Sequence, residues 1–336
     1  MPFIPALIGS ITAGITTVTT AIFGATAGAA IASSLVQFGV SSLLNAAIGA
    51  VFGKQPKAED VGRELSQQST APAYRFVYGE CRATGTPAGI PVKGNFIYGA
   101  WILNSRTSDL QTFTLYMDKR EVVLTGDAFD MNGAGATATE SPFADHLNVW
   151  ISKGFNTAPP KTFTDEAPWV EGTADHLWKT TDAWKGRTVI WMKIHAGSPN
   201  DRQQRWPASP PLVEVEGKWS TVYDPRDVTQ SPTDPSSWKW SENLALCVRD
   251  ALRRNPIRNY KEPQIHESFN EYGPDVCDET VALKSGGSEK RYTCAGTLVF
   301  SQGEIEDLIT PMVISGAAQL IRVGGQLGFA PGEYRA

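Results

Sequence analysis

The sequence predicts a protein of the α+β class, mainly β, with an apolar helical segment at its N-terminus. Three observations lead to this prediction. Residues 1–53 contain no ionisable side chain, short runs of alternating apolar and polar residues begin at Tyr74, and beyond residue 236 the apolar residues recur with helical spacing. We therefore divide the chain into an apolar helical segment (1–53), a linker (54–72), a β domain (73–126 plus 188–230), an inserted domain (127–187) and a C-terminal α+β domain (231–336).

The N-terminal segment is unusual because the first charged side chain of the protein is Lys54. No positively charged region precedes it, as a secretory signal requires, and Ser and Thr interrupt every stretch that would match a membrane span of about 20 apolar residues. Two hypotheses stay open: the helices are buried inside an oligomer, where charges are costly, or they insert later into a membrane. We favour burial, because a solitary molecule would expose this surface and aggregate. The expected lumen or oligomer contacts are Ile11, Ile15, Ile22, Phe23, Gly24, Gly28, Ile31, Leu35, Phe38, Leu43 and Leu44.

The middle of the chain carries the strand signals. Residues 110–117 alternate between two faces, as a half-buried strand does, and Gly and Pro separate successive runs. The insertion 127–187 is irregular and rich in Gly, Ala, Thr, Pro and Trp. The expected strands are Tyr74–Tyr78, Phe96–Leu103, Leu110–Met117, Glu121–Leu124, His146–Ile151, Thr188–Ile194, Leu212–Val215 and Trp219–Tyr223.

The last third combines helices with strands. The apolar residues of 240–252 lie on one helix face, Ser241 is placed as its N-cap, and we assign the Arg residues at its end to the helix dipole rather than to nucleic acid. A proline at 311 implies a kink or a break in the last helix. The expected order is helix 240–252, a helical stretch Glu262–Asp278 interrupted at Gly273-Pro274, strand Arg291–Phe300, helix Gly303–Gln319, and a hairpin turning at Gly324-Gly325.

Charge and cysteine content exclude several classes of function. The net charge of −5 argues against a protein that holds nucleic acid by its phosphates, so no sequence-specific nucleic-acid binding is expected. The four cysteines form no CxxC pair and lie at no zinc-ligand spacing with His. We expect reduced thiols; a pair between Cys277 and Cys294 is the leading exception.

Motifs for catalysis are missing from the sequence. It contains no GxSxG, HExxH, P-loop or GxGxxG pattern. The adjacent carboxylates Asp278 and Glu279 point apart in most conformations, and we interpret them as solvated residues at a helix end. We therefore predict no catalytic residues, no metal, no cofactor and no enzymatic activity.

Four strings, in series, carry a resemblance to a known family. RFVYGECRATGT (75–86), VYDPRD (222–227), WSENLALCVRDAL (240–252) and DVCDETVALKSGGSEKRYTCAGTL (275–298) resemble, in order and spacing, blocks of the tip attachment (host-specificity) protein J family of lambda-like siphophages. The resemblance covers about residues 70–336. The family-motif positions are Arg75, Tyr78, Gly79, Arg82, Tyr223, Asp224, Pro225, Arg226, Trp240, Cys247, Cys277, Asp278, Tyr292 and Cys294.

The resemblance implies a homotrimeric hub in the virion, at the tail tip, made and assembled in the host cytoplasm. In that family, tube-like β hub domains continue the tail tube, an inserted domain decorates its outside, and an α+β hub domain follows. The implied partners are the distal tail protein, other tail-tip subunits and the tape-measure protein. Family members run further, so we expect host recognition to belong to a separate receptor-binding or fibre protein. Two alternatives stay open: a membrane-active pore-forming tail protein, with inner-membrane contact during ejection, and a tail-associated cell-wall hydrolase.

Overall fold

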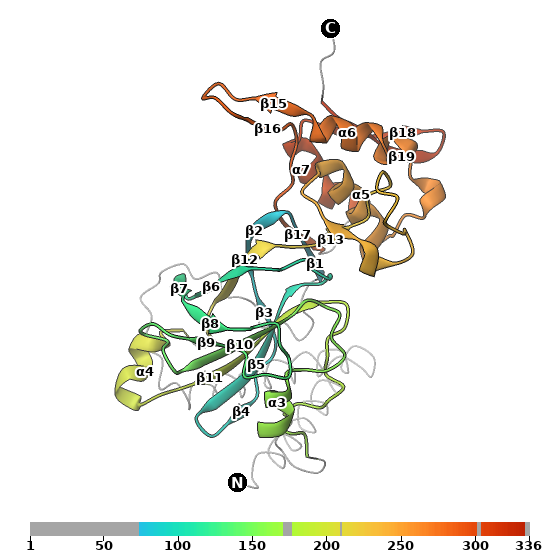
Figure 1. Cartoon of the computed structure of the whole chain (residues 1–336). Coiled ribbons are helices and arrows are strands. Elements are labelled where there is room, and N and C mark those ends of the chain that lie inside the picture. The colour runs from blue at the N-terminus through green and yellow to red at the C-terminus, as the bar shows by residue number, and fades with distance from the viewer. Residues whose placement is uncertain (1–73, 171–176, 209, 301–303, 333–336) are drawn as a thin grey trace, which may run out of the picture.

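The computed structural model describes residues 74–170, 177–208, 210–300 and 304–332, and it has the mixed α+β, mainly β character that the sequence predicts. The expected helical segment 1–53 and linker 54–72 lie outside the described residues. Figure 1 shows the larger sheets at one end of the molecule and most of the helices at the other.

A seven-stranded antiparallel sheet forms the framework. Its central strands β5 (Phe96–Asn104) and β11 (Thr188–His195) are apolar over nearly their whole length, as strands with both faces covered are. The strand order is β3 (Thr86–Gly89), β5 (Phe96–Asn104), β11 (Thr188–His195), β10 (Leu147–Ser152), β9 (Ala136–Ala138) and β8 (Leu124–Gly126), with β4 (Val92–Lys93) also paired to β5.

A four-stranded sheet covers one face of this framework. Its order is β2 (Glu80–Thr84), β12 (Val213–Lys218), β6 (Phe113–Met117) and β7 (Arg120–Val122). The predicted alternation in 110–117 is confirmed for Leu115 and Met117, which are fully buried between the sheets with Val213 and Val215. The period of two therefore decides which face of this sheet packs on the core.

An aromatic layer covers the opposite face of the large sheet. Phe163, on the short helix α3 (Lys161–Glu166), packs edge to face against Trp150 and Trp191. Within the expected inserted domain 127–187, strands β9 and β10 extend the large sheet, and α3 covers it. Sequence pattern could not show this, because the pairing of β10 with β11 depends on a partner distant in the chain.

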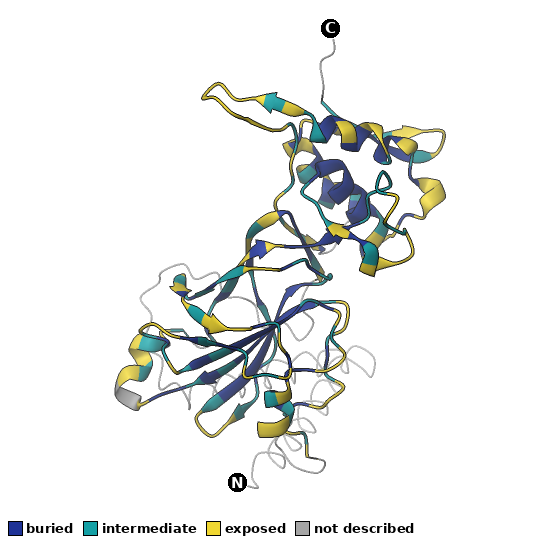
Figure 2. Cartoon of the chain, in the orientation of Figure 1, coloured by how far each residue is buried: buried dark blue, intermediate teal, exposed yellow. Residues whose placement is uncertain are grey.

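The C-terminal region, residues 221–332, packs around the helix α5 (Leu244–Arg254). It also contains α6 (Tyr272–Asp278), α7 (Ile305–Ser315) and the terminal hairpin of β18 (Gln319–Val323) and β19 (Gln326–Ala330), whose predicted turn at Gly324-Gly325 is confirmed. The remaining elements are β13 (Thr221–Val222), β14 (Lys239–Trp240), β15 (Thr280–Ala282), β16 (Ser288–Lys290), β17 (Gly296–Phe300) and the 3-10 turns Pro235–Ser237, Glu262–Gln264 and Glu267–Phe269. The β15–β16 hairpin projects from this region and is largely exposed (Figure 2).

Strand β1 (Tyr74–Tyr78) joins the two parts. It pairs with β17 in register Tyr78↔Gly296. Val77 belongs to the core between the sheets, whereas Phe76 and Tyr78, on the other face of the strand, belong to the core of the C-terminal region. One strand thus supplies side chains to both cores, so a relative movement of the two parts would expose apolar surface.

Several predicted boundaries are wrong in the C-terminal region. Asn243, not Ser241, caps α5, because its side chain accepts a hydrogen bond from the backbone N–H of Leu246 at 3.2 Å. Gly273-Pro274 does not interrupt a helix; it lies in the first turn of α6, where a missing N–H has no cost. The strand predicted from Arg291 begins at Gly296, and α7 continues through Pro311, so the expected alternative of a break at this proline is wrong.

Candidate functional site at the junction of the sheets and the C-terminal region

Most family-motif residues meet where β1 passes between the two parts. We call this place the junction. Its residues come from β1 and the following turn, from the loop after β5, from the loop after β13, from β14, from α5 and its N-cap, from α6, and from the chain before β17. They are Tyr78, Gly79, Arg106, Asp224, Arg226, Trp240, Asn243, Cys247, Asp250, Asp275, Asp278 and Cys294.

Gly79 makes the closest backbone approach of the junction. It has a φ of +67°, and a Cβ at this position would lie 2.0 Å from the carbonyl oxygen of Cys294 and 2.9 Å from the Cα of Ala295. Its own carbonyl accepts hydrogen bonds from the indole N–H of Trp240 at 3.2 Å and from the backbone N–H of Trp219 at 3.0 Å. Only glycine satisfies both the left-handed backbone and the contact.

A buried ion pair lies behind this turn. The Tyr78 hydroxyl donates to Asp250 Oδ2 at 2.7 Å, and the Arg106 guanidinium binds both Asp250 oxygens, with Nη2 at 3.0 Å from Oδ1. Arg106 also lies 5.0 Å from the ring centre of Phe76. Burial, reinforced by the charge of Asp250, raises the pKa of Tyr78. The phenol therefore stays protonated and acts as a donor.

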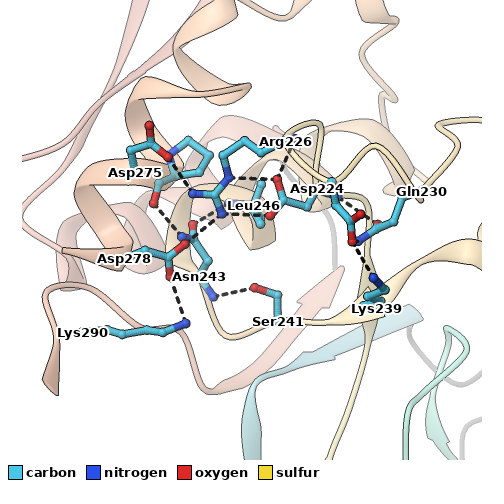
Figure 3. A network of polar contacts seen from close by, with 12 residues as sticks. Asp224, Arg226, Gln230, Lys239, Ser241, Asn243, Leu246, Asp275, Asp278 and Lys290 are labelled. Carbon is cyan, nitrogen blue, oxygen red and sulfur yellow. Dashed lines mark hydrogen bonds and ion pairs between the residues drawn. The ribbon is translucent and has the colours of Figure 1, made fainter. Parts of the chain in front are cut away.

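A second network holds the loop after β13 against α6 (Figure 3). Arg226 donates from Nε and Nη2 to Asp224 at 3.0 and 2.8 Å, from Nη1 to Asp275 at 2.8 Å, and from Nη2 to Asp278 at 2.8 Å. Burial alone would lower the pKa of Arg226, but the hydrogen bonds to the three carboxylates raise it. Lys290, on the projecting hairpin, adds an ion pair to Asp278 at 2.9 Å.

The interpretation of Asp278 and Glu279 as solvated residues is wrong in one respect. They do diverge, but each is ion-paired: Asp278 with Arg226 and Lys290, and Glu279 with Arg291 at 2.8 Å. Burial raises the pKa of Asp278, yet the hydrogen bonds from Arg226 and Lys290 outweigh this and lower it. Because the pKa is lower in the folded state, this carboxylate stabilises the protein above its unfolded pKa of about 3.9, and the contribution is lost as pH falls through the folded value.

Replacing Asp278 by asparagine tests this network. We expect Asp278→Asn to lower the free energy of unfolding at pH 7 by about 1–3 kcal/mol, because two charge-assisted hydrogen bonds lose their acceptor charge. The variant should also lose less stability than the wild type between pH 5 and pH 2 in urea unfolding. Asp165→Asn, which removes the exposed Lys161–Asp165 pair, is the control and should change little. An unaltered acid transition in Asp278→Asn would contradict the assignment.

Asn243 links two helices with one side chain. While its Oδ1 caps α5, its Nδ2 donates to the carbonyl of Pro274, in the first turn of α6, at 2.8 Å. The side chain is only 1% exposed. The sequence Ser-Glu-Asn offers two acceptable caps, and only the packing of α6 selects the second.

The four cysteines are free thiols, and the exceptional Cys277–Cys294 pair is not formed. The side chain of Cys294 instead contacts that of Cys247, at the start of α5. Burial raises the pKa of Cys247, and it raises the pKa of both Cys81 and Cys277 to about 11. These thiols therefore pack as small apolar groups and are poor nucleophiles at neutral pH.

The Arg residues at the end of α5 have specific partners beyond the helix dipole. Arg249 and Arg253 both pair with Glu262, and Arg254 lies 4.2 Å from the ring centre of Trp238. The roles of Glu262 and Asp250 as partners of arginine side chains were not predicted from the sequence. Asp250 could have been suspected as a lone carboxylate among apolar residues of α5, but its partner Arg106 gives no local signal.

The remaining family-motif residues lie around the junction. Arg75 faces the sheets and donates to the carbonyl of Ile102 at 2.7 Å, whereas Arg82 lies on the exposed side of β2, paired with Glu216 at 3.2 Å. Tyr292 bonds the carbonyl of Gly332, and Tyr223 lies under Arg249, 5.2 Å from its guanidinium. Pro225 sits between Asp224 and Arg226 in the turn of the second network. The expected lumen contacts between Ile11 and Leu44 lie outside the described residues.

The arrangement of the junction can couple the sheets mechanically to the C-terminal region. Its charged groups are mutually paired and bridge chain segments that are far apart in sequence. Within the described residues, no group of three or more His, Cys, Asp or Glu side chains is placed to hold a metal ion. A comparison with protein-family models and with curated proteins found no match to the chain.

Proposed function

We propose that this chain is a non-enzymatic structural hub protein of a siphophage tail tip. It closes the distal end of the tail tube as a homotrimer, contacts the tape-measure protein and the distal tail protein, and opens for DNA ejection. The observation that carries the proposal is the series of four strings that resemble, in order and spacing, blocks of the J family. All four contribute residues to one packed junction, and the first of them begins on the strand that the two cores share.

Unpaired strand edges support an assembly of copies. The pairs β15–β16, β18–β19 and β1–β17 are each two-stranded among the described residues, and such pairs leave edges that proteins usually cover or pair. Large apolar side chains are also exposed, with Val228 at 96%, Ile314 at 64% and Val299 at 46%. Copies arranged around a closed ring would pair edges and cover these side chains.

The junction suggests how such a hub transmits force. Because β1 belongs to both cores and the Tyr78–Asp250–Arg106 cluster is buried across them, the sheets and the C-terminal region move together. Opening then takes place between subunits, or by displacement of residues 1–53, which we place on the axis as a plug or as a grip on the tape measure. The apolar residues of that segment fit a shared interior.

Deletion of residues 2–50 tests the plug. We expect the particles either to fail in assembly or to lose DNA prematurely, because the axis is left unfilled. Electron microscopy of tails and a count of filled heads measure both results. Normal assembly followed by normal ejection would contradict the plug.

A membrane-active pore former is the second candidate, favoured by the charge-free residues 1–53 alone. None of the helices formed by the described residues has the length and apolar character needed to cross a bilayer. Liposome leakage caused by a peptide of residues 1–53, with no assembly defect on its deletion, would favour the pore former over the hub. Zymogram activity abolished by a single carboxylate substitution would instead favour a cell-wall hydrolase.

A further inference from the structure

Two histidines meet at one end of the large sheet, far from the junction. His146 immediately precedes β10 and His195 ends β11, so the antiparallel pairing places them side by side. The backbone N–H of His195 donates to the carbonyl of His146 at 2.8 Å, and the rings stack with centres 5.2 Å apart. Phe96 covers the other side of His195 at 4.7 Å.

The tautomer of His146 is fixed by its surroundings. Its Nδ1 lies 2.6 Å from the carbonyl oxygen of Ala144, so Nδ1 carries the proton and donates it. Nε2 is left facing Gly197, whose missing Cβ would lie 3.1 Å from it. The same point is 2.3 Å from Nη1 of Arg205. Gly197 is buried with a φ of +75°, and its missing Cβ lets the imidazole of His146 and the guanidinium of Arg205 pack directly against the turn.

Helix α4 (Pro199–Arg205) contributes cationic donors without acceptors. Arg205 donates from Nε to the carbonyl of Pro142 at 2.6 Å, but its buried Nη1 has no hydrogen-bond partner, nor has the buried Nε of Arg202. A buried donor without an acceptor costs about 1–3 kcal/mol, and more when it is charged. These atoms are therefore arranged for an acceptor that the described residues do not supply.

The helix is also held firmly in this position. Arg120 donates to the carbonyls of Gln204 and Arg205, at 3.2 and 2.6 Å, and the indole N–H of Trp206 donates to the carbonyl of His195 at 3.2 Å. Trp206 is 2% exposed and belongs to the core between the sheets. Arg202 and Arg205, each with one buried nitrogen that lacks an acceptor among the described residues, are thus held on an anchored element.

The charged groups around His195 are predominantly cationic. Burial lowers the pKa of His195, and His146, Arg205, Lys193 and Arg202 lower it further. Glu166 pairs with Lys193 at 2.6 Å, and Asp201, on α4, accepts from the neutral hydroxyl of Ser198 at 2.7 Å. The cations Arg202, Arg205 and Lys193 outnumber these two carboxylates, so the cluster carries net positive charge, which grows when His195 protonates.

We propose that His146, His195, Arg202 and Arg205, around Gly197, form a binding site for a small oxyanion, a phosphate or a carboxylate group. Guanidinium groups bind phosphate groups and carboxylate groups alike, through paired charge-assisted hydrogen bonds. The anion supplies the missing acceptors on Arg202 and Arg205 and neutralises the cluster. Since a bound anion favours protonated imidazole, it is held more tightly as pH falls.

The first test uses inorganic phosphate and the full chain. We expect thermal stability to rise with phosphate at constant ionic strength, maintained with chloride, since a ligand that binds only the folded state stabilises it. Phosphate itself loses a proton between pH 6 and pH 8, so the histidine contribution is measured against His195→Asn. The ratio of wild-type affinity to variant affinity should be up to about tenfold higher at pH 6 than at pH 8, which corresponds to a one-unit shift in a histidine pKa. Stabilisation that is absent, or that chloride reproduces equally, overturns the proposal.

Matched variants locate the site. Arg205→Gln should weaken phosphate binding by at least about tenfold, and Arg202→Gln should weaken it while leaving the contact of Arg205 with Pro142 intact. Arg82→Gln removes an exposed arginine paired with Glu216 and should bind as the wild type does. If Arg205→Gln fails to fold, Arg202→Gln and His195→Asn decide the matter, the second by losing the part of the pH dependence that is not due to the titration of phosphate itself. Equal weakening by Arg82→Gln overturns the assignment.

Two sources of the oxyanion are distinguished by assembly. If the phosphate response of the isolated chain persists in the assembled particle, the ligand is a free anion. If assembly abolishes the response and Arg205→Gln weakens assembly, a carboxylate of a neighbouring subunit occupies the site. If phosphate stabilises neither the isolated chain nor the assembled particle, the proposal is overturned.

Discussion

Replacement of Gly79 by alanine is expected to destabilise the protein more than any other glycine-to-alanine change in a described turn. The new Cβ would lie 2.0 Å from a backbone carbonyl oxygen, and the φ of +67° is unfavourable for alanine. Backbone strain and overpacking each cost about 1–3 kcal/mol, so the free energy of unfolding should fall by about 3 kcal/mol or more. Urea unfolding of the full chain measures this.

Gly94 provides the matched control for this substitution. Its φ is +59°, but a Cβ there meets nothing within 4 Å. Gly94→Ala should therefore reveal the cost of the left-handed backbone alone, about 1 kcal/mol. The difference between the two variants isolates the contact of the turn with Cys294. Equal effects would show that the close approach has no energetic consequence.

Neutralising Asp250 should have a similarly large effect. Asp250→Asn leaves Arg106, whose side chain is 12% exposed, without its counter-charge. Removing one partner of a buried ion pair typically costs about 3–5 kcal/mol, because the remaining charge stays buried and unpaired. Tyr78→Phe, which removes only the hydroxyl bound to Asp250, should cost about 1 kcal/mol. Both are measured as changes in the free energy of unfolding.

An exposed ion pair and a double variant serve as controls. Glu216→Gln breaks the Arg82–Glu216 pair, whose side chains are 41% and 46% exposed, and should cost less than about 1 kcal/mol. Arg106→Met combined with Asp250→Leu removes both charges together and should recover much of the stability lost in Asp250→Asn. A loss in Asp250→Asn no larger than in Glu216→Gln would contradict the buried pair.

The local sequence pattern was sufficient to predict those elements whose conformation depends on their own residues. Strand β1 was predicted with its bounds, β11 within one residue of its end, and the terminal hairpin from Gly324-Gly325, because alternation and left-handed glycines are properties of short segments. The N-cap of α5 was misplaced because Ser241 and Asn243 both suit the position. Tertiary packing against Pro274 decides between them.

Contacts between segments that are distant in the chain could not be predicted from the sequence. Nothing local to Phe76 or Val77 indicates that β1 supplies two cores, or that it pairs with β17 across more than two hundred residues. Of the Arg226 network, Asp224, Arg226 and Asp278 were named only as motif positions, and Asp275 and Lys290 were not predicted, because they are distant from Arg226 in the chain. The His146 and His195 cluster was missed because its donors come from β10, β11 and α4, each unremarkable alone.

Quantitative mass spectrometry of purified particles, after detachment of heads from tails, tests the proposed function most directly. A tail-tip hub predicts that this chain stays with the tails through purification, in the copy number of one homotrimer for each tail. Absence from the particles, or recovery of the intact chain only as a soluble solitary molecule, would contradict the proposal.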